Sequence, residues 1–291
     1  MIVLRSIAEV REWRRSLRSP DQGEVSVGFV PTMGALHAGH LSLIEQAKAV
    51  CDQVIVSVFV NPTQFGPNED FGNYPRDAEG DVALAEGAGA DAVWLGDRAE
   101  LYPDGFQTRV EVTEVARPLC GASRPVHFGG VSLIVLKLFH IVAPHRAFFG
   151  RKDYQQLVLV RTMTRDLDLD IEIVGGETIR EEDGLAMSSR NLRLTAEGRE
   201  AATALYRGLR AAAESYDAGE RSSIALLRAA LTPITAEARV SLEYLELVDA
   251  ETMAALSDVD RPVERPALLA VAAHVDRVRL IDNVVLGESA S

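Results

Sequence analysis

Two histidines in a glycine-containing segment are the residues whose types and spacing most directly suggest chemistry. His37 and His40 enclose Ala38 and Gly39, and Gly34 lies just upstream. If a helix begins here, residues three apart lie on the same side of its first turn. Imidazole N–H groups and the unpaired backbone N–H groups of a helix N-terminus can both donate to an anion, and glycines allow close backbone approach. We therefore expect this segment to hold a phosphate group.

Rival motifs fit this segment poorly. Gly34 and Gly39 have the glycine spacing of a Walker A loop, but His40 and Leu41 stand where that loop needs Lys and Ser or Thr. The dinucleotide-binding GxGxxG pattern and the hydrolase GxSxG pattern are both missing. A zinc site would need further ligands, and none is evident nearby. The structural alternative is a tight turn with two surface histidines.

A second polar segment contains Asn61 and Gln64 and follows an apolar, β-branched run at residues 53–60. Side-chain amides offer neutral donors and acceptors, which suit hydroxyl groups or a carboxylate of a small substrate. Asn61 precedes Pro62, and Asn-Pro is also a common loop start. The segment alone therefore leaves both interpretations open.

Two more segments carry candidate phosphate ligands. Lys152 follows a short apolar run, and Asp153 beside it can favour the N-terminus of the helix expected next. Further along, two hydroxyls and a guanidinium in residues 188–190 can surround a transferring phosphate. The structural alternatives are a solvated Arg-Lys pair for the first segment and a helix cap for the second.

The apolar pattern predicts the elements that position these segments. Uninterrupted β-branched runs at 25–30 and 53–60 indicate buried strands, and residues 41–50 between them have helical spacing. The alternation continues with helices at 78–87, 131–142 and 154–167 and strands at 91–95, 146–150 and 171–174. This order predicts an α/β fold with a Rossmann-like, doubly wound parallel sheet. The first three polar segments all follow strands, so we expect them at the carboxyl edge of that sheet.

The pattern changes after about residue 178. Alanine-rich helices are expected at 195–216 and 224–238, and strands at 240–248, 267–273 and 278–286. We therefore expect two domains, a Rossmann-like domain over residues 1–178 and a smaller α+β domain over residues 179–291.

Composition excludes several classes of protein. The 291 residues are 47% hydrophobic, which is ordinary for a packed globular protein, and the net charge of -13 disfavours nucleic acid as a partner. Cys51 and Cys120 form no CxxC pair, so neither a disulfide framework nor a zinc spacing is indicated. The apolar segment at residues 1–7 is too short for a signal peptide and contains a charge too early. No apolar run reaches the roughly 20 residues that a membrane helix needs. We expect a cytoplasmic protein with no membrane partner.

Taken in order, the motifs HxGH, FVNPxQF, FGxKDxQQ and MSSRN resemble the pantothenate synthetases, also called pantoate–β-alanine ligases. The resemblance covers nearly the whole chain. HxGH alone is shared with all HIGH-type nucleotidylyltransferases and class I aminoacyl-tRNA synthetases, whereas the full ordered set is highly specific.

The resemblance implies an AMP-forming acid–amino-acid ligase of pantothenate and coenzyme A biosynthesis. It would condense (R)-pantoate with β-alanine through a pantoyl adenylate, releasing pyrophosphate and then AMP. ATP would be a substrate, Mg²⁺ would be bound through the ATP phosphates without a dedicated protein site, and the enzyme would be a homodimer. The 1–178 domain would bind nucleotide and pantoate, and the smaller domain would close over them as a lid.

The resemblance also implies roles for particular residues, with His40 as the proton donor. Residues with catalytic roles would be His37, His40, Lys152, Ser188, Ser189 and Arg190. ATP would contact Met33, Gly34, Ala35, Leu36, His37, Ala38, Gly39, His40, Gly150, Arg151, Lys152, Asp153, Ile179, Met187, Ser188, Ser189 and Arg190. The substrates pantoate and β-alanine would contact Met33, Asn61, Gln64 and Gln156. At position 151 the resemblance leads us to expect an acidic residue or another side chain, so Arg151 is a departure. It adds positive charge beside Lys152.

Three rival functions are weighed against this one. Another HIGH-type nucleotidylyltransferase, acting on a phosphate ester, would need extra basic residues for that phosphate, whereas Gln64 and Gln156 suit a hydroxy acid. An aminoacyl-tRNA synthetase would need a tRNA-binding surface, which the net charge and the length disfavour. A non-catalytic ATP-binding sensor would be expected to lack Lys152 or the residues of the 188–190 loop, and both are present.

Overall fold

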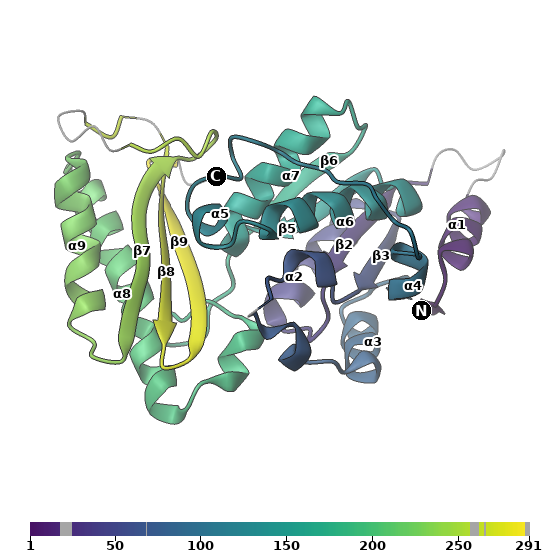
Figure 1. Cartoon of the computed structure of the whole chain (residues 1–291), viewed down its shortest axis with the longest axis horizontal. Helices are drawn as coiled ribbons and strands as arrows, with labels where there is room; N and C mark the ends of the chain where they lie inside the picture. The colour runs from purple at the N-terminus through teal and green to yellow at the C-terminus, as the bar shows by residue number, and fades with distance from the viewer. Residues whose placement is uncertain (18–24, 68, 257–261, 265, 289–291) are drawn as a thin grey trace. The chain divides into compact units, whose positions relative to one another are not determined.

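The computed structural model describes residues 1–17, 25–67, 69–256, 262–264 and 266–288. They fall into two compact units, shown together in Figure 1. The first unit comprises residues 1–112, 124–151 and 159–177, and the second comprises residues 113–123, 152–158 and 178–291. The second unit thus includes two short segments that precede residue 178 in the sequence.

The first unit is built on a six-stranded sheet in the order β1-β4-β3-β2-β5-β6, in which every paired strand is parallel (Figure 1). The chain moves outward from β2 through β3 to one side, and from β5 to β6 on the other. The topological switch point, where ligands bind in open α/β sheets, therefore lies between β2 and β5. The strands are β1 (Ile2–Leu4), β2 (Val27–Thr32), β3 (Gln53–Val58), β4 (Ala92–Leu95), β5 (Arg146–Gly150) and β6 (Glu172–Gly176).

Helices cover both faces of this sheet because its strands are apolar on both sides. Phe29 packs edge-on against Phe139 of one helix, whereas its neighbour Val30 joins a buried cluster with Ile44 of another. Successive residues of a strand point to opposite faces, so these two helices, α6 and α2, lie on opposite sides. The helices are α1 (Ile7–Ser16), α2 (Ala38–Val50), α3 (Ala78–Gly87), α4 (Arg98–Leu101) and α6 (His127–Val142), with 3₁₀ turns η1 (Pro62–Gln64) and η2 (Asp70–Asn73). Two further elements, η3 (Arg151–Asp153) and α7 (Tyr154–Asp166), are divided between the units, because residues 152–158 belong to the second.

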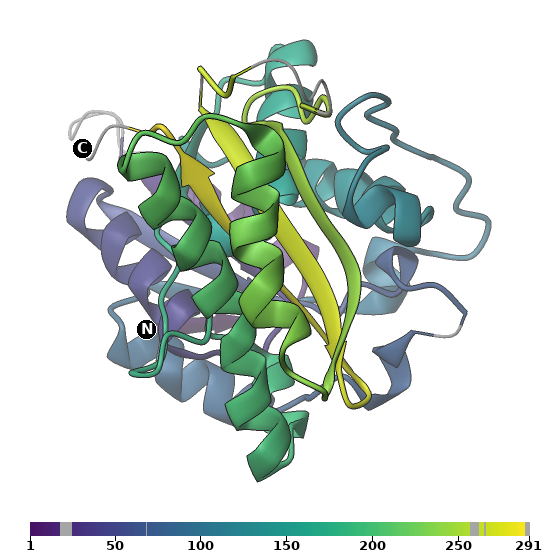
Figure 2. The same ribbon diagram turned by 90° about the vertical axis from the view of Figure 1, so that its left-hand side faces the viewer.

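The second unit is an antiparallel sheet of β7 (Val240–Asp249), β8 (Ala267–Val275) and β9 (Val278–Leu286), in that order. Helices α8 (Ala196–Asp217) and α9 (Ser223–Thr235) lie side by side across one face, as Figure 2 shows. They approach so closely that a Cβ atom on Gly208 would stand 2.5 Å from the Ala230 carbonyl oxygen. Two short elements complete the unit, α5 (Cys120–Ser123) and η4 (Ser189–Arg193).

The expected α/β fold with a smaller α+β unit is confirmed, and every expected strand and helix is present. Most boundaries shift by a few residues, and α9 ends at Thr235 rather than near 238 because a turn follows. The N-terminal elements β1 and α1 were not anticipated, nor were the short helices α4 and α5. Ser6 and Glu9 form a capping box at the start of α1, which is a signal that the sequence contained. Among the described residues, no helix combines the length and apolarity needed to cross a bilayer.

Candidate active site

The HxGH segment is the turn that joins β2 to α2, so it lies at the switch point of the sheet. Gly34 and Ala35 both have left-handed backbone conformations, with φ of 85° and 52°. The Asp81 carboxylate, from the first turns of α3, accepts hydrogen bonds from the backbone N–H groups of Ala35 at 3.0 Å and Leu36 at 2.7 Å. Asp81 is only 3% exposed. A buried carboxylate therefore holds the turn in shape, and sequence reasoning missed it.

The two histidines are held by their own backbone. His37 is the N-cap of α2, and its Nδ1 atom accepts from the Gly39 N–H at 3.2 Å. The Nδ1 atom of His40 accepts from the His37 N–H at 3.4 Å, and the two ring centroids are 4.1 Å apart. A neutral imidazole that accepts at Nδ1 carries its proton on Nε2. In its neutral form each ring therefore carries its N–H on Nε2, where it can donate to a phosphate oxygen.

Asn61 organises the second polar segment. Its Nδ2 group donates to Gln64 Oε1 at 2.9 Å and to the Gly130 carbonyl at 3.2 Å, while its Oδ1 atom accepts from the Tyr102 hydroxyl at 2.8 Å. Asn61 is 1% exposed, so its polar atoms are used within the protein. Burial raises the pKa of Tyr102 further above its ordinary value of 10.0, so that hydroxyl is protonated and can donate. The geometry gives Asn61 the task of orienting its neighbours.

Gln64 is oriented by contacts on both its side chain and its backbone. Its Nε2 group donates to the Met33 sulfur at 3.1 Å, and its carbonyl oxygen lies 3.0 Å from His127 Nδ1. A Cβ atom on Gly130 of α6 would stand 2.3 Å from the Thr63 carbonyl oxygen, so only glycine lets α6 pack this closely on η1. A thioether is a weak acceptor, so the Gln64 amide can exchange Met33 for a stronger partner such as a substrate hydroxyl.

The Lys152 segment begins where β5 ends. The Lys152 side chain is 19% exposed, and its Nζ atom lies 3.7 Å from Asp153 Oδ2. Gln155 is buried and bonds to three backbone groups of residues 115–120, whereas its neighbour Gln156 is half-buried. The Arg151 guanidinium pairs with Glu177 at 2.8 Å, so its charge is balanced locally.

The 187–190 loop is closed by short-range backbone bonds. The Met187 N–H donates to the Ile179 carbonyl at 2.9 Å, which brings these two expected ATP contacts together. Ser188 caps η4, since its hydroxyl accepts from the Arg190 N–H at 3.3 Å. Ser189 is buried, and Ser188 and Arg190 are half-buried. The helix-cap interpretation of Ser188 is therefore correct locally, and it leaves the hydroxyl proton available for donation.

The expected site residues divide between the two units. The first unit holds Met33, Gly34, Ala35, Leu36, His37, Ala38, Gly39, His40, Asn61, Gln64, Gly150 and Arg151. The second holds Lys152, Asp153, Gln156, Ile179, Met187, Ser188, Ser189 and Arg190. Within the first unit the structure brings His37 beside His40 and Gln64 beside both Met33 and Asn61.

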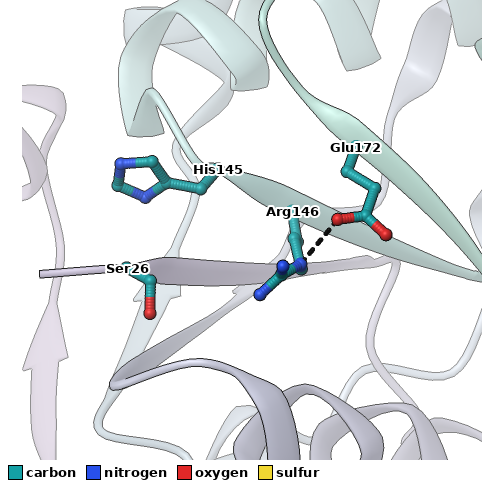
Figure 3. Close-up of a pocket in the computed structure, with 4 residues that line it drawn as sticks. All are labelled: Ser26, His145, Arg146 and Glu172. Atoms are coloured by element: carbon teal, nitrogen blue, oxygen red, sulfur yellow. Dashed lines mark hydrogen bonds and ion pairs between the residues drawn. The ribbon is translucent and has the colours of Figure 1, made fainter.

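A hollow of about 260 Å³ lies elsewhere in the first unit (Figure 3). It is lined by Ser26, His145, Arg146 and Glu172, and Arg146 and Glu172 are the first residues of β5 and β6. The hollow therefore lies at the amino edge of the sheet, opposite the edge that carries the HxGH turn. Arg146 Nε donates to Glu172 Oε2 at 2.6 Å, so its charge is already paired. Within the described residues, no three His, Cys, Asp or Glu side chains gather in a way that could hold a metal ion.

Comparison with known proteins decides the family. The sequence model of the pantoate-beta-alanine ligase family matches residues 2–285. The chain belongs to the pantoate–β-alanine ligase family. It is 53% identical to the pantothenate synthetase of Acidobacterium capsulatum over 98% of this chain and 96% of that protein. The resemblance inferred from the motifs is thus confirmed, and membership in this ligase family makes the chain an enzyme.

Solved structures of the family share the fold. The pantothenate synthetase of Thermus thermophilus is 46% identical and superposes with a TM-score of 0.89 over 98% of this chain and 99% of that one. The pantoate–β-alanine ligase of Francisella tularensis, solved in complex with beta-gamma ATP and β-alanine, is 34% identical with a TM-score of 0.79, covering 98% and 97% of the two chains. The fold expected from the alternation of strands and helices is therefore the fold of this ligase family.

Proposed function

We propose that this ligase joins (R)-pantoate to β-alanine in two steps that consume ATP. The observation that carries the proposal is the HxGH turn, which presents two Nε2–H donors and a helix N-terminus at the switch point of the sheet. The Francisella relative was solved with an ATP compound and β-alanine, which supports the same substrates here.

The chemistry follows from the poor reactivity of a carboxylate toward amines. In the first step a carboxylate oxygen of pantoate forms a bond to the α-phosphorus of ATP, and the bond to pyrophosphate breaks. In the second step the β-alanine amine attacks the pantoyl carbonyl carbon, the bond to AMP breaks, and a proton leaves the amine. AMP is a far better leaving group than oxide or hydroxide, so ATP cleavage makes the amide bond accessible.

The residues of the site stabilise charge and fix geometry in this scheme. His37 and His40 donate hydrogen bonds from Nε2 to phosphate oxygens. The role of proton donor, which the family resemblance gives to His40, needs the imidazolium form of its ring, because a neutral ring that gave up its Nε2 proton would be left as an anion. Lys152 and the 188–190 loop supply an ammonium, two hydroxyls and a guanidinium to the same phosphates. The other expected ATP contacts follow from the family and are Met33, Gly34, Ala35, Leu36, Ala38, Gly39, Gly150, Arg151, Asp153, Ile179 and Met187.

Gln64 and Gln156 hold the pantoate hydroxyls, and Met33 lines that site. Asn61 already orients the Gln64 amide by donating to its Oε1 atom, and the polar atoms of Asn61 are themselves hydrogen-bonded. Preorganised amides of this kind bind a hydroxy acid without reorienting first. We therefore propose Asn61 as a residue that positions Gln64, in place of the direct substrate contact expected from its type.

Magnesium is proposed to arrive with ATP. The candidate phosphate ligands are N–H, O–H and ammonium donors, which fit phosphate oxygens and not a bare cation. Mg²⁺ bound to the phosphates neutralises their charge when present, and it needs few protein ligands. We further propose, from the family resemblance, a cytoplasmic homodimer with domains 1–178 and 179–291, in which the smaller domain closes over the nucleotide.

Isotope exchange tests the two-step scheme. Labelled pyrophosphate is incubated with the enzyme, ATP, Mg²⁺ and pantoate, with β-alanine omitted. Formation of labelled ATP is expected, because the first step is reversible while the adenylate stays bound. Exchange that requires β-alanine would contradict the adenylate intermediate. Exchange with a phosphate ester in place of pantoate would favour another HIGH-type nucleotidylyltransferase, and ATP binding with no exchange or AMP formation would favour a sensor.

A further inference from the structure

Two consecutive residues of β9, Asp282 and Asn283, are buried polar residues that the motif analysis did not select. They are 3% and 9% exposed. Consecutive strand residues point to opposite faces, so their side chains leave β9 in different directions. Each side chain reaches a different segment of the second unit, and both segments carry residues assigned above to ATP.

Asn283 holds the Lys152 segment. Its Nδ2 group donates to the Lys152 backbone carbonyl at 2.8 Å. A lysine ammonium stands at the end of a flexible four-carbon stem, so the position of its backbone limits where the charge can go. Asn283 makes this bond from a regular strand, which is a more rigid support than a loop.

Asp282 holds the loop that leads to residues 187–190. Its carboxylate makes two bonds to the Arg180 guanidinium, at 2.6 Å and 3.0 Å. Arg180 is further fixed by the Gly184 carbonyl at 3.1 Å and by the Tyr206 ring, whose centroid is 4.2 Å away. The backbone of Arg180 forms an isolated antiparallel β-bridge with Ala186, the residue directly before the expected ATP contacts at 187–190. The bidentate ion pair therefore attaches that loop to β9, in addition to the bonds that Arg199 makes to Glu181 and Asp183.

The two attachments are linked through the backbone of β9. The Asp282 carboxylate also accepts from the Asn283 backbone N–H at 2.8 Å, which fixes the Asp282 side chain against the same stretch of backbone that carries Asn283. We propose that Asp282 and Asn283 are positioning residues for ATP: they attach the Lys152 segment and the 179–190 loop to one strand and fix the two relative to each other. This inference rests on the proposed function for the roles of Lys152 and the loop.

Hydrogen exchange and kinetics test the proposal together, using Asn283→Ala and Asp282→Asn in the full chain. Asn283→Ala should increase amide exchange in peptides covering residues 150–154, and Asp282→Asn should do so in peptides covering residues 179–190. Val285→Ala, at a half-buried position of the same strand, is the matched control and should change neither segment. If Asp282→Asn does not fold, Arg180→Lys keeps the charge and loses the bidentate geometry.

The kinetic arm separates positioning from stability. Asn283→Ala should raise KM for ATP and lower pyrophosphate exchange by about 5- to 10-fold, the effect of losing one net hydrogen bond, with KM for β-alanine unchanged. A variant that only lowers the melting temperature, with unchanged kinetics per folded molecule, would overturn the proposal. Unchanged amide exchange in both segments would overturn it as well. Absence of pyrophosphate exchange in the unmodified enzyme would instead contradict the two-step scheme. The amide-exchange measurements would then still test whether Asp282 and Asn283 attach the two segments to β9.

Discussion

Asp81→Asn is the most informative single substitution in the first unit. The wild-type carboxylate accepts two backbone hydrogen bonds, from Ala35 at 3.0 Å and Leu36 at 2.7 Å, in a site that is 3% exposed. Asparagine has nearly the same shape but offers only one oxygen. Its amide nitrogen would face one of the two N–H groups, so that donor would lose its acceptor while remaining buried.

The expected loss can be estimated from these contacts. A hydrogen bond to a charged acceptor contributes about 1.5–3 kcal/mol, and an unsatisfied buried N–H costs about 1–3 kcal/mol. Burying a neutral amide costs less than burying a carboxylate, which offsets part of the sum. We expect the free energy of unfolding to fall by about 2–4 kcal/mol. Without the Asp81 carboxylate, the left-handed conformations of Gly34 and Ala35 are no longer held. The N-terminus of α2 and both histidines then lose their fixed orientation.

Asp77→Asn is the matched control. Asp77 is the exposed N-cap of the same helix, where its Oδ1 atom accepts from the Gly80 N–H at 3.0 Å. Asparagine caps helices about as well as aspartate, so we expect a change within about 1 kcal/mol.

Urea denaturation measures the stability of both variants, and pyrophosphate exchange at saturating ATP and pantoate measures the first step. Asp81→Asn should lose at least about 10-fold in exchange rate, since small misplacements of catalytic groups are costly. If Asp81→Asn proves as stable and as active as Asp77→Asn, then the buried carboxylate does not hold the turn and the reasoning fails.

Three further predictions concern other residues. His37→Asn retains a helix cap but lacks the Nε2–H donor, so it should unfold like the wild type in urea yet lose about 10²-fold in rate, whereas His37→Ala should lose stability as well. Lys152→Ala should lower the steady-state rate about 10²- to 10³-fold, and a near-normal rate would remove Lys152 from the mechanism. Hydrogen bonds from Arg279 lower the pKa of Glu243 to about 2, below its ordinary 4.5. The stability that this pair contributes is present above about pH 4.5 and is lost as pH falls toward 2. In urea denaturation, the free energy of unfolding of Glu243→Gln should therefore fall less over that pH range than that of the wild type.

The sequence was sufficient for the main elements because the sheet of the first unit is buried on both faces. Continuous, largely β-branched runs such as residues 54–58 are typical of buried strands and not of loops. The helices between these runs then predict that the strands are parallel. The two missed N-terminal elements had weaker signals. β1 is three residues long with Ile2 more than half exposed, and α1 has only Val10 and Trp13 buried, so neither shows a strong apolar pattern.

The sequence also predicted which segments carry chemistry, since donors cluster after β2, β3 and β5. It could not show what each donor does within its segment. Asn61 and Gln64 look equivalent as amides, yet Asn61 is saturated by intramolecular bonds while Gln64 has only a thioether opposite its Nε2 group. That difference depends on Tyr102 and Gly130, which are distant in the sequence and belong to no motif.

Asp81, Asp282 and Asn283 share the property that hid them from motif analysis. Each is a buried polar side chain on a regular element, and each bonds to a group more than 40 residues away, with separations of 45, 102 and 131 residues for Leu36, Arg180 and Lys152. A helix or strand fixes its side chains better than a loop does, so a loop with strained or flexible backbone is best held from such an element. The HxGH turn and the 179–190 loop are both held in this way, each by a carboxylate. In the proposed function their donors contact phosphate, so the N–H and guanidinium groups that face the protein need an acceptor inside it, and a carboxylate supplies two oxygens for that purpose.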